Sequence, residues 1–61
     1  MEYLIRNNEN NILQIEENIS EKKVDIHIVN PHEELSITLD LEKLKELQSI
    51  INTITKNLCI Y

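Results

Sequence analysis

Residues 24–40, VDIHIVNPHEELSITLD, place the strongest constraint on the fold of this sequence. Apolar and polar residues alternate on both sides of Asn30 and Pro31. Asparagine is favoured at the first position of a type I turn, and proline supplies the φ angle of the second. A turn there pairs Ile28 with Leu35, Ile26 with Ile37, and Val24 with Leu39. Because this pairing places all six apolar side chains on one face, the segment predicts a β-hairpin with a buried face.

The N-terminal part of the chain predicts a second hairpin. Residues 2–6 and 12–17 also alternate, and the polar run NNENN, residues 7–11, separates them. The chain has no glycine, so asparagine is the residue best able to take a left-handed turn conformation. Pairing Tyr3 with Ile15 and Ile5 with Leu13 again puts the apolar side chains on one face. With a polar connection at 18–22, strands at about 23–29 and 34–39 complete a four-stranded antiparallel meander. A three-stranded sheet with the first six residues loose is the alternative.

A helix is predicted directly after the fourth strand, over residues 41–58. Asp40 is a suitable N-cap, and Glu42 lies in the first turn, where the helix dipole favours an acid. The apolar residues follow a three-four spacing that gives one continuous stripe: Leu44, Leu47, Ile51, Ile54 and Leu58. The predicted fold class is therefore α+β, a single ββββα domain over residues 1–61 with the helix packed on the apolar face of the sheet.

The length of the chain predicts self-association. A domain of 61 residues is near the limit at which one core offsets the entropy of folding. The lone cysteine, Cys59, excludes an internal disulfide, and no Cys/His set has zinc-site spacing, so we expect a two-fold homodimer. The apolar arc of the helix is wider than one small sheet covers, which leaves a set of expected dimer or partner contacts: Leu44, Leu47, Ile50, Ile51, Ile54, Leu58, Ile60 and Tyr61. The alternatives are that these residues serve only the chain's own core, or that sheet edges form the interface.

Charge and composition narrow the possible partners. The net charge is −5, with six basic residues scattered among eleven acids, which argues against direct nucleic-acid binding. No apolar run is long enough for a membrane span, and the N-terminus lacks the pattern of a secretory signal. We therefore expect a cytoplasmic protein with a protein partner and no membrane. The abundance of Ile, Asn, Lys and Glu is typical of an AT-rich genome, such as that of a low-GC bacterium or its phage.

The residues that could carry chemistry are Asp25, His27 and Ser36, which the predicted register places on the polar face of the sheet. A catalytic zinc site needs three protein ligands, and no third ligand is predicted near Asp25 and His27. A Ser36-His27-Asp25 triad would lack an oxyanion hole and a substrate pocket on an open sheet face. Cys59 has Lys56 as its only basic neighbour and is expected to be a small packed side chain. We therefore predict no enzymatic activity, no catalytic or metal residues and no cofactor.

In size, acidic composition and expected topology, the whole chain resembles the small phage-encoded proteins that block bacterial defence systems, among them anti-CRISPR and Hachiman anti-defence proteins. The resemblance includes no motif, so it assigns no functional residue. It implies inhibition by occlusion, in which the protein covers the working surface of a bacterial defence enzyme. Two alternatives are a housekeeping regulatory or assembly subunit of antitoxin type, and an acidic mimic of nucleic acid.

Overall fold

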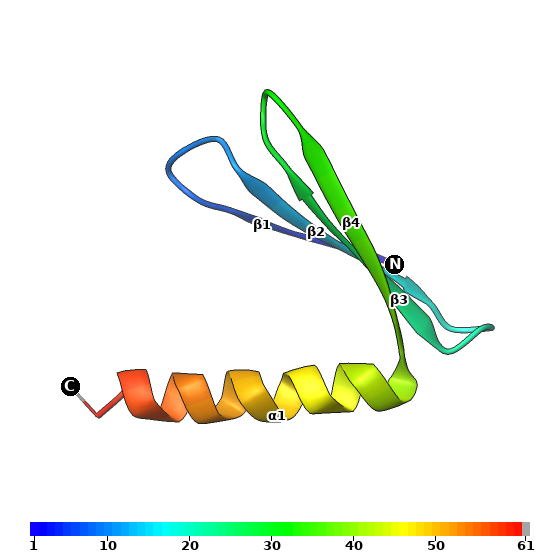
Figure 1. The fold of residues 1–61 in the computed structure, drawn as a ribbon, viewed down its shortest axis with the longest axis vertical. Coiled ribbons are helices and arrows are strands. Elements are labelled where there is room, and N and C mark those ends of the chain that lie inside the picture. The colour runs from blue at the N-terminus through cyan, green and yellow to red at the C-terminus, as the bar shows by residue number, and fades with distance from the viewer. Residues whose placement is uncertain (61) are drawn as a thin grey trace.

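The computed structural model describes residues 1–60 and consists of one sheet followed by one helix (Figure 1). The elements are, in chain order, β1 Glu2–Arg6, β2 Ile12–Asn18, β3 Lys23–Val29, β4 Glu34–Asp40 and α1 Leu41–Leu58. All four strands are antiparallel neighbours in the order β1-β2-β3-β4. The predicted α+β meander with a C-terminal helix is confirmed, and the three-stranded alternative is wrong because β1 pairs with β2 along its whole length.

The strand register follows from the alternation of apolar residues. The predicted pairs Ile28 with Leu35 and Tyr3 with Ile15 are both observed. The two hairpins join through β2 and β3, where Leu13 pairs with Ile28. This register gathers the apolar side chains of all four strands on one face, which we call the inner face: Tyr3, Ile5, Leu13, Ile15, Val24, Ile26, Ile28, Leu35, Ile37 and Leu39.

Each loop of the sheet begins with an asparagine whose side-chain oxygen accepts backbone N–H groups inside the loop. These residues are Asn7, Asn18 and Asn30. Such bonds satisfy backbone donors that no strand partner reaches. Two loop residues take the left-handed conformation, Asn10 with φ 64° and Lys22 with φ 56°. The expectation that asparagine replaces glycine in the first loop is therefore confirmed, whereas in the second loop a lysine takes this role.

The helix starts without any linker after β4. Asp40 ends the strand with φ −79° and ψ 176°, and its Oδ1 accepts the N–H of Lys43 at 2.9 Å. At the other end, the N–H of Cys59 donates to the carbonyl oxygen of Thr55 at 3.0 Å. The predicted N-cap is confirmed, and because no residue separates the two elements, the direction of the helix is set at Asp40.

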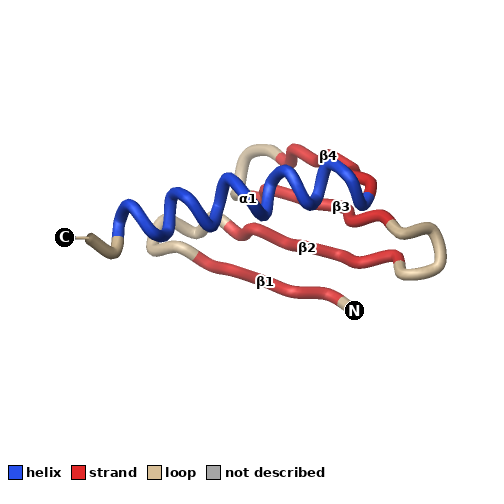
Figure 2. The backbone as a smooth tube through the Cα atoms, turned by 90° about the horizontal axis from the view of Figure 1, so that it is seen from below, coloured by secondary structure: helices blue, strands red, loops and turns tan. Residues whose placement is uncertain are grey.

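The helix does not cover the sheet as expected. Among the described elements α1 contacts β3 and β4 alone, and Figure 1 shows helix and sheet diverging from the β4 junction as the two arms of a V. Seen from below, the helix lies on one side of the sheet and runs along the strands (Figure 2). Within residues 1–60, Val24 alone is buried, with 4% of its surface exposed. The predicted packing on the apolar face is thus limited to the region beside the junction.

Candidate protein-binding surface

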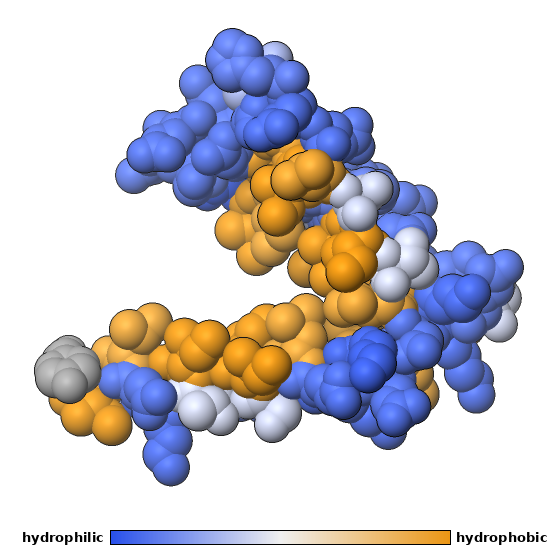
Figure 3. Space-filling view, in the orientation of Figure 1, coloured by the Kyte–Doolittle hydropathy of each residue, from blue (hydrophilic) through white to orange (hydrophobic). Residues whose placement is uncertain are grey.

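Two apolar walls face each other across the V. Figure 3 shows apolar side chains on the lower side of the sheet and on the upper side of the helix, with an open cleft between them. Large apolar side chains on both walls are about half exposed or more, and we call this set the inner apolar surface: Tyr3, Ile5, Ile28, Leu35 and Ile37 on the sheet, and Ile51, Ile54 and Leu58 on the helix. The single chain therefore exposes apolar side chains of the kind that usually form a protein core.

The spacing of residues explains why the two walls face each other. Inner-face side chains lie two apart on each strand, and the helix stripe follows the three-four spacing of a single helix face. Both walls line a cavity of about 350 Å³, with Ile15 and Ile26 on the sheet side and Leu44, Leu47 and Ile51 among those on the helix side. The cavity lies in the interior of the V, so these walls belong to a single surface.

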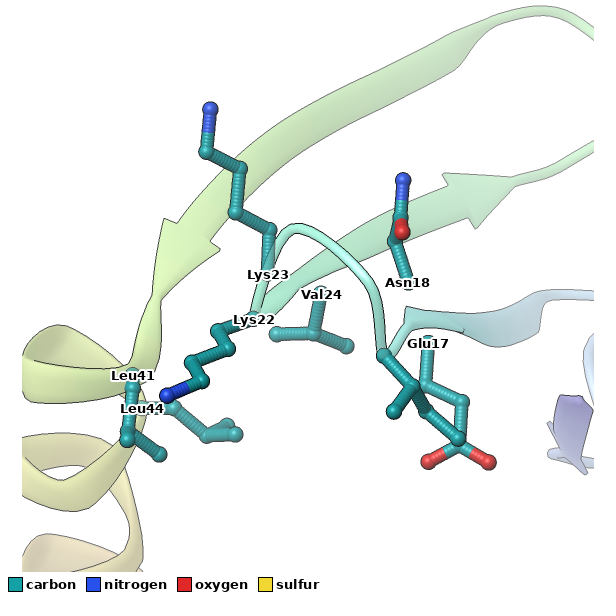
Figure 4. A pocket seen from close by; sticks show the side chains of 8 residues that line it. Glu17, Asn18, Lys22, Lys23, Val24, Leu41 and Leu44 are labelled. Carbon is teal, nitrogen blue, oxygen red and sulfur yellow. The ribbon is translucent and has the colours of Figure 1, made fainter.

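The cleft is closed at its vertex and open at its mouth. Figure 4 shows the vertex, where Val24 points into a pocket of about 330 Å³ and the side chain of Lys22 extends toward Leu41 and Leu44. Along β3, the exposed fraction rises from 4% at Val24 to 48% at Ile28. Among the inner-face residues of β3, burial therefore decreases from Val24 toward the mouth of the cleft.

The structure places most of the contact residues expected from sequence. Leu44, Leu47, Ile51, Ile54 and Leu58 lie along the helix wall, as the heptad-like spacing predicts. Ile50 lies on the flank of this stripe, and Ile60 follows the helix end; both are exposed. Tyr61 lies outside the described residues.

The sheet half of the surface was not expected from sequence. The alternation of apolar residues instead predicts that Ile28, Leu35 and Ile37 form the chain's own core under the helix. The direct junction of Asp40 and Leu41 leaves the direction of the helix to the backbone angles of Asp40, which the pattern of apolar residues does not specify.

The polar residues considered for chemistry lie on the other face of the sheet. Asp25 is opposite Thr38 and His27 is opposite Ser36, as predicted. The hydroxyl of Thr38 donates to Oδ1 of Asp25 at 2.5 Å. His27 Nδ1 lies 3.7 Å from Glu34 Oε1, which is too long for a hydrogen bond. The register thus brings these residues together, but the contacts do not connect Asp25 to His27.

Comparison with family models, with curated proteins and with solved structures finds no match to this chain. Any functional conclusion therefore depends on the surface itself. Within residues 1–60, no group of three or more His, Cys, Asp or Glu side chains is arranged to hold a metal ion. The same residues contain no helix that combines the length and apolar character needed to span a bilayer.

Proposed function

We propose that this chain is a non-enzymatic protein-binding module that binds protein through its inner apolar surface. The observation that carries the proposal is the pair of facing apolar walls, on which Leu35 and Leu58 are 61% and 69% exposed. Soluble monomers rarely expose contiguous apolar surface beyond a few hundred Å², and larger patches mark interaction sites. The matching partner surface is apolar, because no charged side chain lies on the helix stripe between Leu47 and Leu58.

The biological role that best accords with such a module is inhibition of a bacterial anti-phage defence enzyme by occlusion, in the cytoplasm of the host. The small size, the net charge of −5 and the resemblance to phage-encoded anti-defence proteins support this role. Occlusion requires a folded protein that covers a working surface, and it requires neither a nucleophile nor a cofactor. Association driven by apolar burial meets this requirement.

The polar face of the sheet supports binding over catalysis. A Ser-His-Asp relay needs the carboxylate against the imidazole, to orient it and to stabilise its charge. In this chain the carboxylate of Asp25 accepts the hydroxyl of Thr38 instead. His27 Nδ1 has no hydrogen-bond partner, and the nearby carboxylate belongs to the exposed Glu34. The proposal therefore assigns no catalytic role to this cluster.

The proposal is tested by affinity capture with matched variants. Tagged protein is incubated with lysate of a low-GC bacterium that carries several defence systems, and bound proteins are identified by mass spectrometry. Ile51→Asp introduces a charge on the helix wall, whereas Ser49→Asp introduces the same charge on the opposite side of the helix, about 160° away. We expect a nuclease or helicase of a defence system in stoichiometric amount with the wild type and with Ser49→Asp, and at least a ten-fold loss with Ile51→Asp.

A second readout connects binding to inhibition. The captured enzyme is purified and assayed with increasing amounts of each variant, and its activity should fall with the wild type and Ser49→Asp alone. Equal capture and equal inhibition by both variants would contradict the assignment of the inner apolar surface. Capture without any loss of enzyme activity would contradict inhibition while leaving protein binding in place.

A further inference from the structure

The area exposed by this chain is too large for a compact protein of its mass. A folded monomer of 7.2 kDa is expected to expose about 4,100 Å², whereas this chain exposes 5481 Å². The difference is about 1,400 Å² per chain, or about 2,800 Å² for two chains. Permanent homodimer interfaces start at about 2,000 Å² in total and are mostly apolar. The excess thus has the size and the character of one such interface.

We propose that the inner apolar surface is covered by a second copy of the chain, in a two-fold dimer formed mouth to mouth between two V-shaped clefts. This inference rests on the proposed function because it concerns the same surface: the second copy covers it in the free protein, and a defence enzyme that binds there replaces that copy. In the dimer, the two sheets and two helices enclose one common core. Each helix tip covers the far end of the other copy's sheet, so Ile54 and Leu58 of one chain lie against Ile28 and Leu35 of the other.

The need for a cover before any target is bound favours a second copy as the partner of the free chain. Val24 alone is buried among residues 1–60, and the lone Cys59 excludes an internal disulfide. A chain of this size without a core requires a cover in order to fold at all. The cover must be present wherever the chain is made and in equal amount, and a copy of the chain meets both conditions.

The shape of the cleft fits this arrangement. Exposure rises toward the mouth on both walls, to 61% at Leu35 and 69% at Leu58, so the uncovered area is concentrated where two clefts would meet. The helix of 18 residues is about 27 Å long, and the seven-residue strand β3 spans about 23 Å. A two-fold axis through the mouth therefore pairs elements of similar length, which makes the surface self-complementary.

The charge distribution favours a dimer in which each helix packs against the other copy's sheet over a dimer in which the two sheets stack. Residues 1–40 contain nine acidic and three basic residues, whereas residues 41–61 contain two acidic and three basic residues. A dimer of two stacked sheets would bring the two acidic segments together. The mouth-to-mouth dimer instead places the slightly basic helix of each copy beside the acidic sheet of the other, which reduces repulsion.

Two measurements test the dimer. The first is the mass of the unmodified protein by light scattering, expected at twice the 7.2 kDa of one chain. The second uses Cys59 as a fixed thiol at the helix tip and adds a partner thiol by Leu35→Cys, at the far end of the inner face. Mild oxidation should link two chains covalently, as seen on a non-reducing gel. Ser36→Cys, one residue along on the outer face, is the matched control and should give at least ten-fold less linked dimer.

Each other outcome overturns the inference in a different way. An internal disulfide within a single Leu35→Cys chain would mean that the helix closes on its own sheet, which contradicts the proposed function as well. A 7.2 kDa mass with no disulfide of either kind, together with capture of a defence enzyme that is lost in Ile51→Asp, would overturn the dimer and leave the proposed function standing. Equal linking by both thiol variants, or a dimeric mass without linking in Leu35→Cys, would exclude the mouth-to-mouth geometry.

Discussion

At the scale of single residues, the turns depend on side chains that replace glycine. Asn10 lies at φ 64° in a chain without glycine. A left-handed conformation raises the free energy of most residues by about 1–2 kcal/mol. The cost is smaller for asparagine, because its short polar side chain tolerates that region. Asn10→Ala should therefore lower the free energy of unfolding by about 1 kcal/mol, measured by urea denaturation at fixed protein concentration.

The same loop contains the controls for this prediction. Asn10→Gly should retain or raise the stability, because glycine adopts positive φ without strain. Asn8→Ala changes a loop residue outside the left-handed region and should have an effect within about 0.5 kcal/mol. An equal loss for Asn8→Ala and Asn10→Ala would mean that the φ angle at residue 10 does not determine the stability of the loop.

The N-cap gives a second prediction at this scale. Oδ1 of Asp40 accepts the N–H of Lys43 at 2.9 Å, and it does so at the point where strand becomes helix. Asp40→Ala should destabilise the fold by about 1 kcal/mol, because a first-turn donor loses its acceptor. Asp40→Asn keeps an acceptor and should restore most of that loss in the same urea titration. A similar loss for both variants would assign the effect to the charge of Asp40 instead of its hydrogen bond.

At the scale of elements, strands and register could be predicted from sequence, but the direction of the helix could not. The alternation of apolar residues and the Asn30-Pro31 turn are compatible with a single strand register, in which Ile28 and Leu35 share a face. That register is observed. The helix direction depends on the backbone angles of one residue, Asp40, whose ψ is 176°. Residue preferences do not specify a single dihedral angle that closely, so the sequence predicted a closed packing where the structure has an open one.

A truncation on the helix wall distinguishes a helix covered by a second copy from a helix exposed to solvent. Ile54 is 50% exposed in the single chain, and truncating a side chain exposed to that extent usually changes stability by less than about 0.5 kcal/mol. If a second copy covers it, Ile54→Ala should cost about 2–3 kcal/mol in urea denaturation, as for a core residue. Thr53→Ala, its neighbour away from the stripe, should remain within about 0.5 kcal/mol. A small effect for both variants would contradict coverage of this wall.

At the scale of the whole molecule, half of the inner apolar surface could be predicted from sequence. The width of the apolar arc and the short chain length indicated that Ile51, Ile54 and Leu58 exceed what one sheet can cover. The sheet half, with Ile28 and Leu35, could not be predicted, because the same residues serve equally well in a core within one chain or in a core shared by two chains. Which of the two they form depends on the angle between sheet and helix, and that angle is a property of the assembled chain.

If a second copy covers the inner apolar surface, the stability of this protein depends on its concentration. If two folded chains separate as they unfold, mass action raises the Tm when more protein is present. With an unfolding enthalpy of about 0.7 kcal/mol per residue over two chains, a ten-fold increase in protein should raise the Tm by about 6 °C, measured by circular dichroism.

Ionic strength and a variant with a charge on the helix wall provide two further tests of the same dimer by thermal unfolding. Each chain carries a net charge of −5, so in the proposed dimer the two chains repel each other by charge while apolar burial holds them together. Added salt screens that repulsion without weakening apolar burial, and the Tm should therefore rise between low and physiological ionic strength. Ile54→Asp places a charge in the proposed shared core and should remove the cooperative unfolding transition, because the uncovered chain has no core of its own. A Tm that stays constant over a hundred-fold range of wild-type concentration would contradict the shared core, because a chain that unfolds alone has no second copy to lose.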